Sequence, residues 1–500
     1  MDSERGAKPD FPLELLKKGA KVYFVGIKGT GMCALAELMH NRGITVSGSD
    51  SKEVFYTDGI LKELGIPFYE SFEASHIKDS VPDLVIYSAA YFSETNAEIA
   101  EAQRLLIPSW KYPDALGAYS YLFDSTGIAG VHGKTTTTAL IGTLLSGLGL
   151  PAQVLAGSAV GNFGNRSTLN LGEKYFVAET CEYRRHFLSF HPKSIVLTSV
   201  EKDHLDYFPT LKAIKEAFLE YGRLLPPDGV LIYCADDEGA SEVAGVLKTE
   251  KPGVNLIPYG FNAEGGYRIE SYRVADESAL IRLKGFPDEF RIRVPGRHTA
   301  LNAAAAIALC SLLVGKEFGS AGFDGWNEER SLGLRSALEG FKGSKRRSEI
   351  LGEAGAILFM DDYGHHPTAI KTTLEGLKDF YPGRRLVVSF MSHTYTRTSK
   401  LLDEFAASFE KADFLLLHKI YPSAREVYNG GVSGYTLFER TLEKFPFRKG
   451  CIFYAEEADD GFELMKANLK SGDLFITMGA GDNWRLGKKL FDFYRQGKWQ

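Results

Sequence analysis

Short apolar runs that alternate with longer helical stretches constrain the fold of this chain more than any other feature. From Lys21 onward, runs such as KVYFVG (21–26) and ITVSGSD (44–50) are separated by segments long enough for a helix, for example Met32 to Arg42. This alternation is typical of βαβ units, in which strands buried on both faces read as continuous apolar runs. The sequence therefore predicts an α/β protein with mainly parallel sheets.

The alternation falls into three blocks. Further strands are expected at 83–88 in the first block, at 127–131, 175–180, 194–200 and 229–234 in the second, and at 356–363, 385–390, 413–419, 451–456 and 473–479 in the third. Residues 267–295 hold three β-rich runs with no room for helices, which predicts a small antiparallel sheet. A chain of 500 residues accommodates three domains of ordinary size. We expect an N-terminal Rossmann-like domain over 1–121, a central P-loop domain over 122–344 and a C-terminal Rossmann-like domain over 345–500.

Composition argues against several classes of partner. The net charge is −6 and no basic block is present, so we expect no nucleic-acid partner. The longest apolar run, 303–314, is too short to cross a bilayer and predicts a buried helix, and the polar segment Met1–Asp10 lacks the apolar core of a signal peptide. Five scattered cysteines without metal-ligand spacing predict neither disulfides nor a zinc site. We expect a cytoplasmic protein with no membrane partner.

A glycine-rich loop in the second block predicts a nucleotide site. Gly130-Val131-His132-Gly133-Lys134-Thr135 directly follows a predicted strand and opens a helix with Thr136. In such a loop the backbone N–H groups surround phosphate oxygens, the lysine contacts the β and γ phosphates, and the threonine hydroxyl can ligate Mg²⁺. The glycine spacing departs from the common pattern, but the position between strand and helix favours nucleotide binding over a chance match.

A second glycine loop lies near the N-terminus. Gly26, Gly29 and Gly31 follow the first predicted strand, and Asp50 ends the next one. This arrangement suits the diphosphate of a dinucleotide or of a nucleotide sugar at a helix N-terminus, with an acidic residue near the ribose. The spacing is not that of the dinucleotide fingerprint, so a tight turn between strand and helix is the alternative.

Acidic and imidazole side chains follow two strands of the second block. Glu179 and Glu182 end one predicted strand, and the segment Glu201 to Asp206, which contains His204, ends the next. The carboxyl ends of parallel strands meet at one edge of a sheet, so these groups are expected near the phosphate loop. Carboxylates and a neutral imidazole can bind Mg²⁺ or orient its waters. The alternative is that these are ordinary exposed strand ends.

The third block carries a comparable cluster. Asp361 to Pro367 follows one predicted strand, and His393 to Arg397 follows the next. Aspartate, tyrosine, histidine and arginine at neighbouring strand ends form a site able to hold a carboxylate and to move a proton. The short basic run Lys342 to Glu349 lies in a predicted linker, where it is either a solvated face or the source of an arginine that contacts a γ-phosphate.

Taken together, these motifs resemble the Mur ligase family of ATP-dependent amide-forming enzymes of peptidoglycan precursor synthesis. The resemblance extends from about Lys21 to the last helix. It rests on GIKGTGM with SGSD, GVHGKTTTT, ETCEYRRHFL with DHLDYF, VPGRHTALNAAAAI, KRRSE with DDYGHHPT, and HTYTRT with GAGDN. Six motifs in the same order over three domains are far more specific than any single loop.

The resemblance implies a role for each matching residue. Contacts to the UDP sugar are expected from Gly26, Gly29, Thr30, Gly31, Asp50, Ser88, His132, Asn165 and Arg166, the last two in a loop. ATP contacts are expected from Gly130, His132, Gly133, Lys134, Thr135, Thr136, His298, Asn302, Arg347 and Asp362. The implied metal ligands are Thr135, Glu179 and His204, and the implied amino-acid pocket holds Tyr363, His365, His393 and Arg397. Lys134, Arg347, His365 and His393 are the implied catalytic residues.

The implied reaction joins L-alanine to the lactyl carboxylate of UDP-N-acetylmuramate through an acyl phosphate. ATP and Mg²⁺, with Mn²⁺ as an alternative ion, are the expected cofactors, and the protein is expected to be a monomer or a weak homodimer. Three alternatives remain open at this point. They are the family branch that joins a whole peptide to UDP-N-acetylmuramate, a nicotinamide-dependent dehydrogenase that uses the Gly26 loop, and an ATP switch without catalysis.

Overall fold

The described residues of the computed structural model are 12–204, 207–319, 326–422, 426, 428 and 430–497. They fall into two compact units. The first comprises residues up to 201, 212–268 and 303–337, and the second comprises 202–211, 269–302 and the chain from 338 onward. Met1–Asp10, whose polarity predicts no signal peptide, and Asp206 lie outside the described residues.

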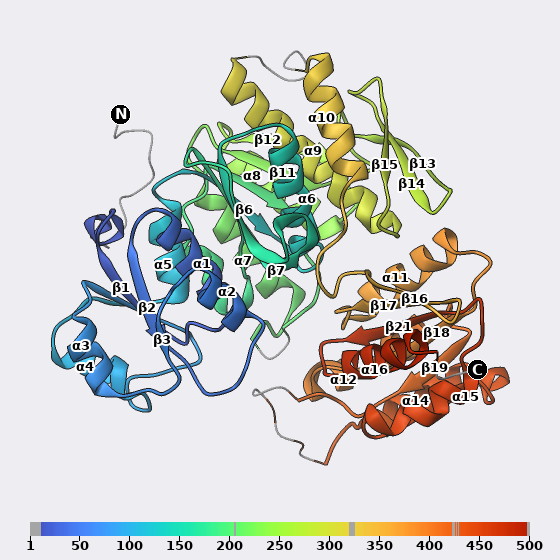
Figure 1. Ribbon diagram of the computed structural model, residues 1–500. Coiled ribbons are helices and arrows are strands. Elements are labelled where there is room, and N and C mark those ends of the chain that lie inside the picture. The colour runs from blue at the N-terminus through green and yellow to red at the C-terminus, as the bar shows by residue number, and fades with distance from the viewer. Residues whose placement is uncertain are drawn as a thin grey trace. The chain divides into compact units, whose positions relative to one another are not determined.

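The first unit begins with a five-stranded parallel sheet in the order β3-β2-β1-β4-β5. Figure 1 labels β1, β2 and β3 of this sheet. Its strands are β1 (Lys21–Val25), β2 (Thr45–Ser49), β3 (Phe68–Tyr69), β4 (Leu84–Tyr87) and β5 (Ser109–Lys111). A 3-10 turn, η2 (Leu13–Leu16), precedes them, and the helices are α1 (Thr30–Asn41), α2 (Thr57–Glu63), α3 (Ala74–Ser80), α4 (Ala97–Arg104) and α5 (Tyr112–Ser120). The strand order reverses beside β1, and in such sheets ligands bind at the carboxyl ends next to that reversal. The loop after β1 is therefore placed for binding.

The same unit contains a seven-stranded sheet in the order β12-β11-β10-β6-β9-β7-β8. Its strands are β6 (Asp124–Ala129), β7 (Ala152–Val160), β8 (Arg166–Asn170), β9 (Tyr175–Glu179), β10 (Ser194–Leu197), β11 (Val230–Cys234) and β12 (Asn255–Tyr259). The accompanying helices are α6 (Lys134–Gly147), α7 (Leu211–Arg223), α8 (Glu238–Glu250), α9 (Arg297–Phe318) and α10 (Glu328–Glu339), with 3-10 turns η3 (Gly161–Phe163) and η4 (Tyr183–Ser189). Residues 297–302 of α9 belong to the second unit. All neighbouring strands are parallel except β7 and β8. Because β6 is central, the phosphate loop that follows it lies in the middle of the carboxyl edge.

Helix α9 supplies much of the buried surface of the central region. The side chains of Ala303 to Cys310 are fully buried, which confirms the prediction of a buried helix there. Among the described residues α9 is the one helix long and apolar enough to cross a membrane, and most of its apolar stretch is buried within the protein.

The second unit contains the antiparallel sheet that the sequence predicts. Its strands β13 (Ile269–Ala275), β14 (Ser278–Leu283) and β15 (Glu289–Ile292) pair in sequence order.

The second unit also contains a six-stranded sheet in the order β16-β17-β21-β18-β19-β20, parallel except at β16. Its strands are β16 (Glu349–Ala354), β17 (Ile357–Asp362), β18 (Leu386–Met391), β19 (Phe414–Leu417), β20 (Ile452–Tyr454) and β21 (Leu474–Gly479). The helices are α11 (Pro367–Phe380), α12 (Tyr395–Lys400), α13 (Leu402–Ser408), α14 (Gly434–Lys444), α15 (Phe462–Asn468) and α16 (Trp484–Arg495), with 3-10 turns η7 (Pro446–Arg448) and η8 (Asp459–Gly461). Because β17 and β18 flank β21, the segments that follow them lie at one edge of the sheet.

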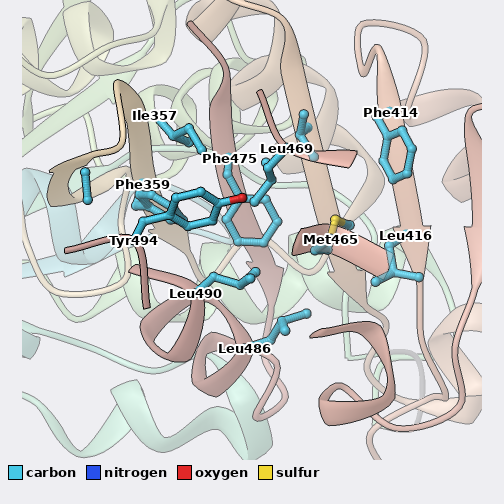
Figure 2. Packing of buried hydrophobic residues seen from close by; sticks show 12 residues of the cluster. Ile357, Phe359, Phe414, Leu416, Met465, Leu469, Phe475, Leu486, Leu490 and Tyr494 are labelled. Carbon is cyan, nitrogen blue, oxygen red and sulfur yellow. The ribbon is translucent and has the colours of Figure 1, made fainter. Parts of the chain in front are cut away.

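The core of this sheet is closed by α16 (Figure 2). Leu486, Leu490 and Tyr494 recur every four residues and so line one face of the helix. They pack with Phe359 of β17 and Phe475 of β21, all nearly or completely buried. Each large apolar side chain buried in this way contributes about 1.5–3 kcal/mol, so the strand ends that carry polar residues rest on a rigid base.

The predicted fold class, three α/β domains with mainly parallel sheets and a small antiparallel patch, is confirmed. Every strand expected from the apolar runs is present. The expectation that Arg166 lies in a loop is wrong, because Arg166 is the first residue of β8 and pairs with Val160 of β7.

Candidate active site

The N-terminal glycine loop is fixed by hydrogen bonds to the end of β2. The N–H groups of Gly26 and Ile27 both donate to the Ser49 carbonyl, at 2.8 and 3.0 Å. The N–H of Lys28 donates to Asp50 Oδ2 at 2.7 Å. The structure therefore brings Asp50 and the glycine loop together, with the carboxylate holding the loop backbone.

Two of the loop glycines are required by their neighbours. A Cβ on Gly26, whose φ is +86°, would lie 2.7 Å from the Tyr91 ring and 3.1 Å from Ser88 Cβ. A Cβ on Gly31 would lie 2.8 Å from the Tyr112 ring. Either methyl group would displace an aromatic side chain, so the close approach of Ser88 to Gly26 depends on glycine at that position.

The same loop leads into helix α1. Gly29 precedes the helix and Thr30 is its first residue, with the Thr30 hydroxyl oxygen accepting a hydrogen bond from Tyr56 at 3.2 Å. The free N–H groups of such a first turn, together with the positive end of the helix dipole, favour a bound anion.

The phosphate loop places Lys134 between backbone and carboxylate. Gly130 and Gly133 have φ angles of +135° and +81°, which favour glycine. Lys134 Nζ donates to the Gly130 carbonyl and pairs with Glu182 Oε2 at 2.9 Å. Burial favours the neutral amine, but the carboxylates of Glu182 and Glu179 outweigh it and raise the pKa of Lys134. The lysine is therefore charged and held against the loop.

A threonine and a glutamate form a pair of oxygen ligands beside this loop. The Thr135 hydroxyl donates to Glu179 Oε1 at 3.1 Å, and the Gly157 N–H donates to Glu179 Oε2 at 2.8 Å. Hydroxyl and carboxylate oxygens are the protein ligands that Mg²⁺ prefers. Thr135 and Glu179 therefore fit the expected metal.

Two further residues expected at ATP are placed near the same loop. The His132 N–H donates to Ser199 Oγ at 2.9 Å, and His132 Nε2 lies 2.9 Å from Glu201 Oε1. Thr136 is half-buried in the first turn of α6.

Arg166 connects the two sheets of the first unit. Its guanidinium pairs with Glu37 of α1 and, at 2.8 Å, with Glu63 of α2. Glu37 is buried and also accepts a hydrogen bond from Thr168 of β8 at 2.5 Å. The preceding Asn165 has a left-handed backbone, with φ +62°. Arg166 therefore carries an ion pair between α1 and the β7–β8 hairpin.

A cavity of about 160 Å³ lies within the first unit, between the start of α1 and the end of β9. Gly31 and Tyr112 line it from the N-terminal region, and Gly157, Glu179 and His186 line it from the central region. Burial and then Arg184 lower the pKa of His186, so this side chain adds no positive charge at neutral pH. The cavity thus extends from the start of α1 to the carboxylate proposed for the metal.

In the second unit the four residues expected at the amino acid come together. Tyr363 and His365 follow β17, and their rings are 5.1 Å apart. His393 follows β18, with its ring 5.7 Å from that of His365, and Arg397 on α12 lies with its Nη1 3.2 Å from His393 Nδ1. Burial and then the charge of Arg397 hold the pKa of His365 well below its usual range. The cluster therefore offers a neutral imidazole beside a guanidinium.

Arg397 is joined in this cluster by an acidic residue. Both Nε and Nη2 of Arg397 donate to Asp203 Oδ1, at 3.0 and 2.6 Å, and both side chains are buried. The N–H of His204 donates to the same oxygen at 2.7 Å. His204 itself has a left-handed backbone, with φ +49°.

The remaining expected residues of the second unit lie near the start of β16 and at the start of α9. Arg347 stands 5.2 Å from the Tyr363 ring centroid, and Asp362 is buried and accepts the N–H groups of Ser348 and Gly364, each at 2.6 Å. Asp362 therefore holds the chain on both sides of the Tyr363 segment.

His298 and Asn302 lie on the first turns of α9, and Asn302 is buried. A Cβ on the neighbouring Gly296 would lie 2.3 Å from the His298 ring. This packing fixes the imidazole against the turn that begins the helix.

Comparison with known proteins decides the family. Models of the Mur ligase family match residues 21–123 (the family catalytic domain), 128–310 (the middle domain) and 346–481 (the glutamate ligase domain). The chain belongs to the Mur ligase family.

Individual Mur ligases resemble the chain over nearly its whole length. A protein from Treponema pallidum named UDP-N-acetylmuramate–L-alanine ligase is 51% identical over 478 residues, covering 96% of this chain and 97% of its own. The protein of that name from Borreliella burgdorferi is 37% identical and covers 93% of this chain and 97% of its own. The crystal structure of the UDP-N-acetylmuramate–alanine ligase from Thermotoga maritima superposes with a TM-score of 0.72 at 26% identity, covering 95% of this chain and 99% of that one.

Sequence reasoning missed several Mur ligase residues that the structure places at the site. Glu182 and Asp203 stand in motifs that the sequence singles out, but nothing local shows that they pair with Lys134 and Arg397. Gly157 and Tyr112 carry no motif and are brought to the cavity by β7 and α5. The one signal available in the sequence was that Glu182 and Asp203 stand close to the predicted metal ligands Glu179 and His204.

Proposed function

We propose that this protein is the ATP-dependent ligase that joins L-alanine to the lactyl carboxylate of UDP-N-acetylmuramate. The names of relatives up to 51% identical over nearly the whole chain support this reaction. The observation that carries it is the cavity between the start of α1 and Glu179. It extends from the first glycine loop to Glu179, which accepts a hydrogen bond from Thr135 of the phosphate loop.

In this proposal the UDP sugar binds at the first glycine loop. Gly26, Gly29, Thr30 and Gly31 receive the diphosphate at the start of α1, and Asp50 and Ser88 stand beside that loop. His132, Asn165 and Arg166 are the further proposed contacts. The N-acetylmuramoyl group then lies in the cavity with its carboxylate toward Glu179.

ATP binds at the phosphate loop. Gly130, His132, Gly133 and Thr136 enclose its phosphates, and Lys134 neutralises the charge that develops on the transferred phosphoryl group. Thr135, Glu179 and His204 would hold Mg²⁺ or Mn²⁺, which supplies further charge neutralisation. His298, Asn302, Arg347 and Asp362 are proposed as the remaining ATP contacts.

The amino acid binds in the cluster of Tyr363, His365, His393 and Arg397. Its carboxylate is recognised by the Arg397 guanidinium. Because a neutral amine is the nucleophile, the ammonium group must first lose a proton. His365 or His393, whose rings lie 5.7 Å apart, is proposed to accept that proton.

The chemistry requires activation because a carboxylate does not react with an amine at neutral pH. The lactyl carboxylate attacks the γ-phosphorus of ATP, forming an acyl phosphate and ADP. The amine then attacks the acyl carbon, and the tetrahedral intermediate expels inorganic phosphate and leaves an amide.

We propose domain boundaries near 121 and 344, so that 1–121, 122–344 and 345–500 serve the UDP sugar, ATP and the amino acid. A cytoplasmic monomer or weak homodimer with no nucleic-acid or membrane partner fits this role, because all three substrates are soluble.

Phosphate release from ATP tests the proposal. The protein is assayed with UDP-N-acetylmuramate, with and without L-alanine, glycine, L-serine or a tripeptide. Release that needs the sugar nucleotide and L-alanine together is the expected result. Release with the tripeptide but not with alanine would instead assign the peptide-joining branch, and reduction of a nicotinamide cofactor would refute a ligase.

A further inference from the structure

Arg397, the residue proposed to bind the carboxylate of the amino acid, already has hydrogen-bond partners. Of the five N–H groups of Arg397, that of Nε and one of the two on Nη2 donate to Asp203 Oδ1. Nη1 donates to the His393 carbonyl at 2.6 Å and contacts His393 Nδ1 at 3.2 Å. A carboxylate is gripped most firmly by two parallel N–H donors of a guanidinium. One Nη2 N–H remains, so a carboxylate cannot accept two parallel hydrogen bonds from Arg397 while Asp203 stays paired with it.

Asp203 is equally committed to this pair. Its side chain is buried, and its Oδ1 takes both Arg397 hydrogen bonds and that of the His204 N–H. The described residues donate no hydrogen bond to Oδ2. Oδ1 is therefore fully used, whereas Oδ2 lies 4.0 Å from His204 Nε2, beyond hydrogen-bond distance, and keeps its capacity to accept a hydrogen bond.

Separating this pair with a singly charged ligand is unfavourable. A buried charge that loses its partner retains the full penalty of its removal from water. A simple carboxylate bound to Arg397 would leave Asp203 unpaired, and a simple amine bound to Asp203 would leave Arg397 unpaired. An α-amino acid carries both charges on one carbon and can satisfy the two side chains at once.

We propose that Asp203 binds the ammonium group of the incoming amino acid. The substrate replaces one ion pair with two, its carboxylate on Arg397 and its ammonium on Asp203. This inference rests on the proposed function, and it adds a specificity-determining residue to the amino-acid pocket. The His393 ring lies 5.7 Å from that of His365, and His393 Nδ1 lies 3.2 Å from Arg397 Nη1, so an ammonium held by Asp203 enters the cluster that contains the imidazoles proposed to take its proton.

The pair acts as a filter for zwitterions. Propionate and ethylamine each match half of alanine, and each would leave one buried charge without a partner. Wild-type protein should therefore be inhibited by either compound far more weakly than alanine binds, by about 100-fold or more.

The test compares Asp203→Asn with Asp403→Asn in the full chain at saturating ATP, UDP-N-acetylmuramate and Mg²⁺. The amide introduced by Asp203→Asn keeps an oxygen for the His204 N–H and removes only the charge. Asp403 is an exposed partner of Arg440 in the same unit and serves as the matched control. We expect Asp203→Asn to raise the KM for L-alanine by about 10- to 100-fold and to lower the inhibition constant of propionate, because Arg397 is then free to pair with it. Asp403→Asn should change neither.

The opposite signs separate ammonium binding from a structural role. If alanine and propionate weaken by the same factor, Asp203 merely shapes the pocket and the proposal is overturned. An unchanged KM for alanine, or a change confined to the Mg²⁺ requirement, overturns it as well. The wild-type panel decides the question if Asp203→Asn does not fold, since strong inhibition by propionate alone contradicts the filter. Failure of wild type to release phosphate with any amino acid would instead refute the proposed function.

Discussion

Gly157 offers the sharpest single perturbation of the proposed phosphate-transfer site. Its N–H donates to Glu179 Oε2, and a Cβ at this position would lie 2.4 Å from that oxygen and 2.7 Å from Glu179 Cδ. Its φ lies outside the left-handed region, so Gly157→Ala carries no backbone penalty of its own. The whole effect of the added methyl group therefore falls on the Glu179 carboxylate.

The size of the effect follows from the contact distance. An ordinary van der Waals contact begins near 3.4 Å, so the carboxylate must retreat by 3.4 − 2.4 = 1.0 Å. That movement breaks its hydrogen bonds to the Gly157 N–H and the Thr135 hydroxyl. A hydrogen bond to a charged group is worth about 1.5–3 kcal/mol, so the loss of both bonds in Gly157→Ala should weaken Mg²⁺ activation by about 100-fold or more.

The assay is Mg²⁺ titration of alanine-dependent phosphate release, with thermal unfolding measured in parallel. Gly245→Ala is the matched control, because a Cβ there meets nothing within 4 Å and the residue lies in helix α8. It should keep wild-type activation and gain about 0.5–1 kcal/mol of stability. Wild-type Mg²⁺ dependence in Gly157→Ala would refute the assignment of Glu179 to the metal or its dependence on Gly157.

Three further outcomes are expected. Lys134→Ala should abolish ATP-dependent ligation but leave UDP-sugar binding, followed by calorimetric titration, nearly intact; equal loss of both would argue against separate phosphate and UDP sites. Arg397→Ala should raise the KM for the amino acid with little change for ATP in steady-state assays, and an unchanged value would remove it from the pocket. Burial lowers the pKa of His418 from its ordinary 6.5 to about 4. Between pH 6.5 and about 4 the unfolded chain binds a proton at His418 that the folded protein does not bind. The free energy of unfolding therefore falls as the pH drops through this range, by about 2 kcal/mol at pH 5. Urea unfolding at pH 7 and pH 5 should show this loss, and His418→Asn should reduce it.

The fold was largely predictable because parallel strands are buried on both faces. β4 and β19 read as unbroken apolar runs, as expected for strands buried inside a parallel sheet. The strands that the sequence did not reveal lie at sheet edges or carry polar residues. β8 includes Arg166 and Asn170, and it exists because β7 pairs with it from the other side. Such pairing is decided by tertiary structure and leaves no local apolar pattern.

The site divides in the same way. Lys134 and Thr135 were predictable because a phosphate loop is built from consecutive residues. The ion pairs of Lys134 with Glu182 and of Arg397 with Asp203 were not, because the Arg397 partner is 194 residues distant and several carboxylates compete at each strand end. Gly157 was also beyond prediction, since its role is to leave space for Glu179.

The ion pair of Arg166 and Glu37 has a consequence for substrate size. It joins α1, whose first turn follows the diphosphate loop, to β8, and β8 pairs with β7, the strand that holds Gly157 against Glu179. The two ends of the cavity therefore belong to one continuous scaffold with a fixed separation. In the proposed binding mode, a donor molecule must match this separation in the length of its covalent chain between diphosphate and carboxylate. On this basis the scaffold selects donors by length, and a donor whose two ends could each bind, but whose linker is too long or too short, is rejected.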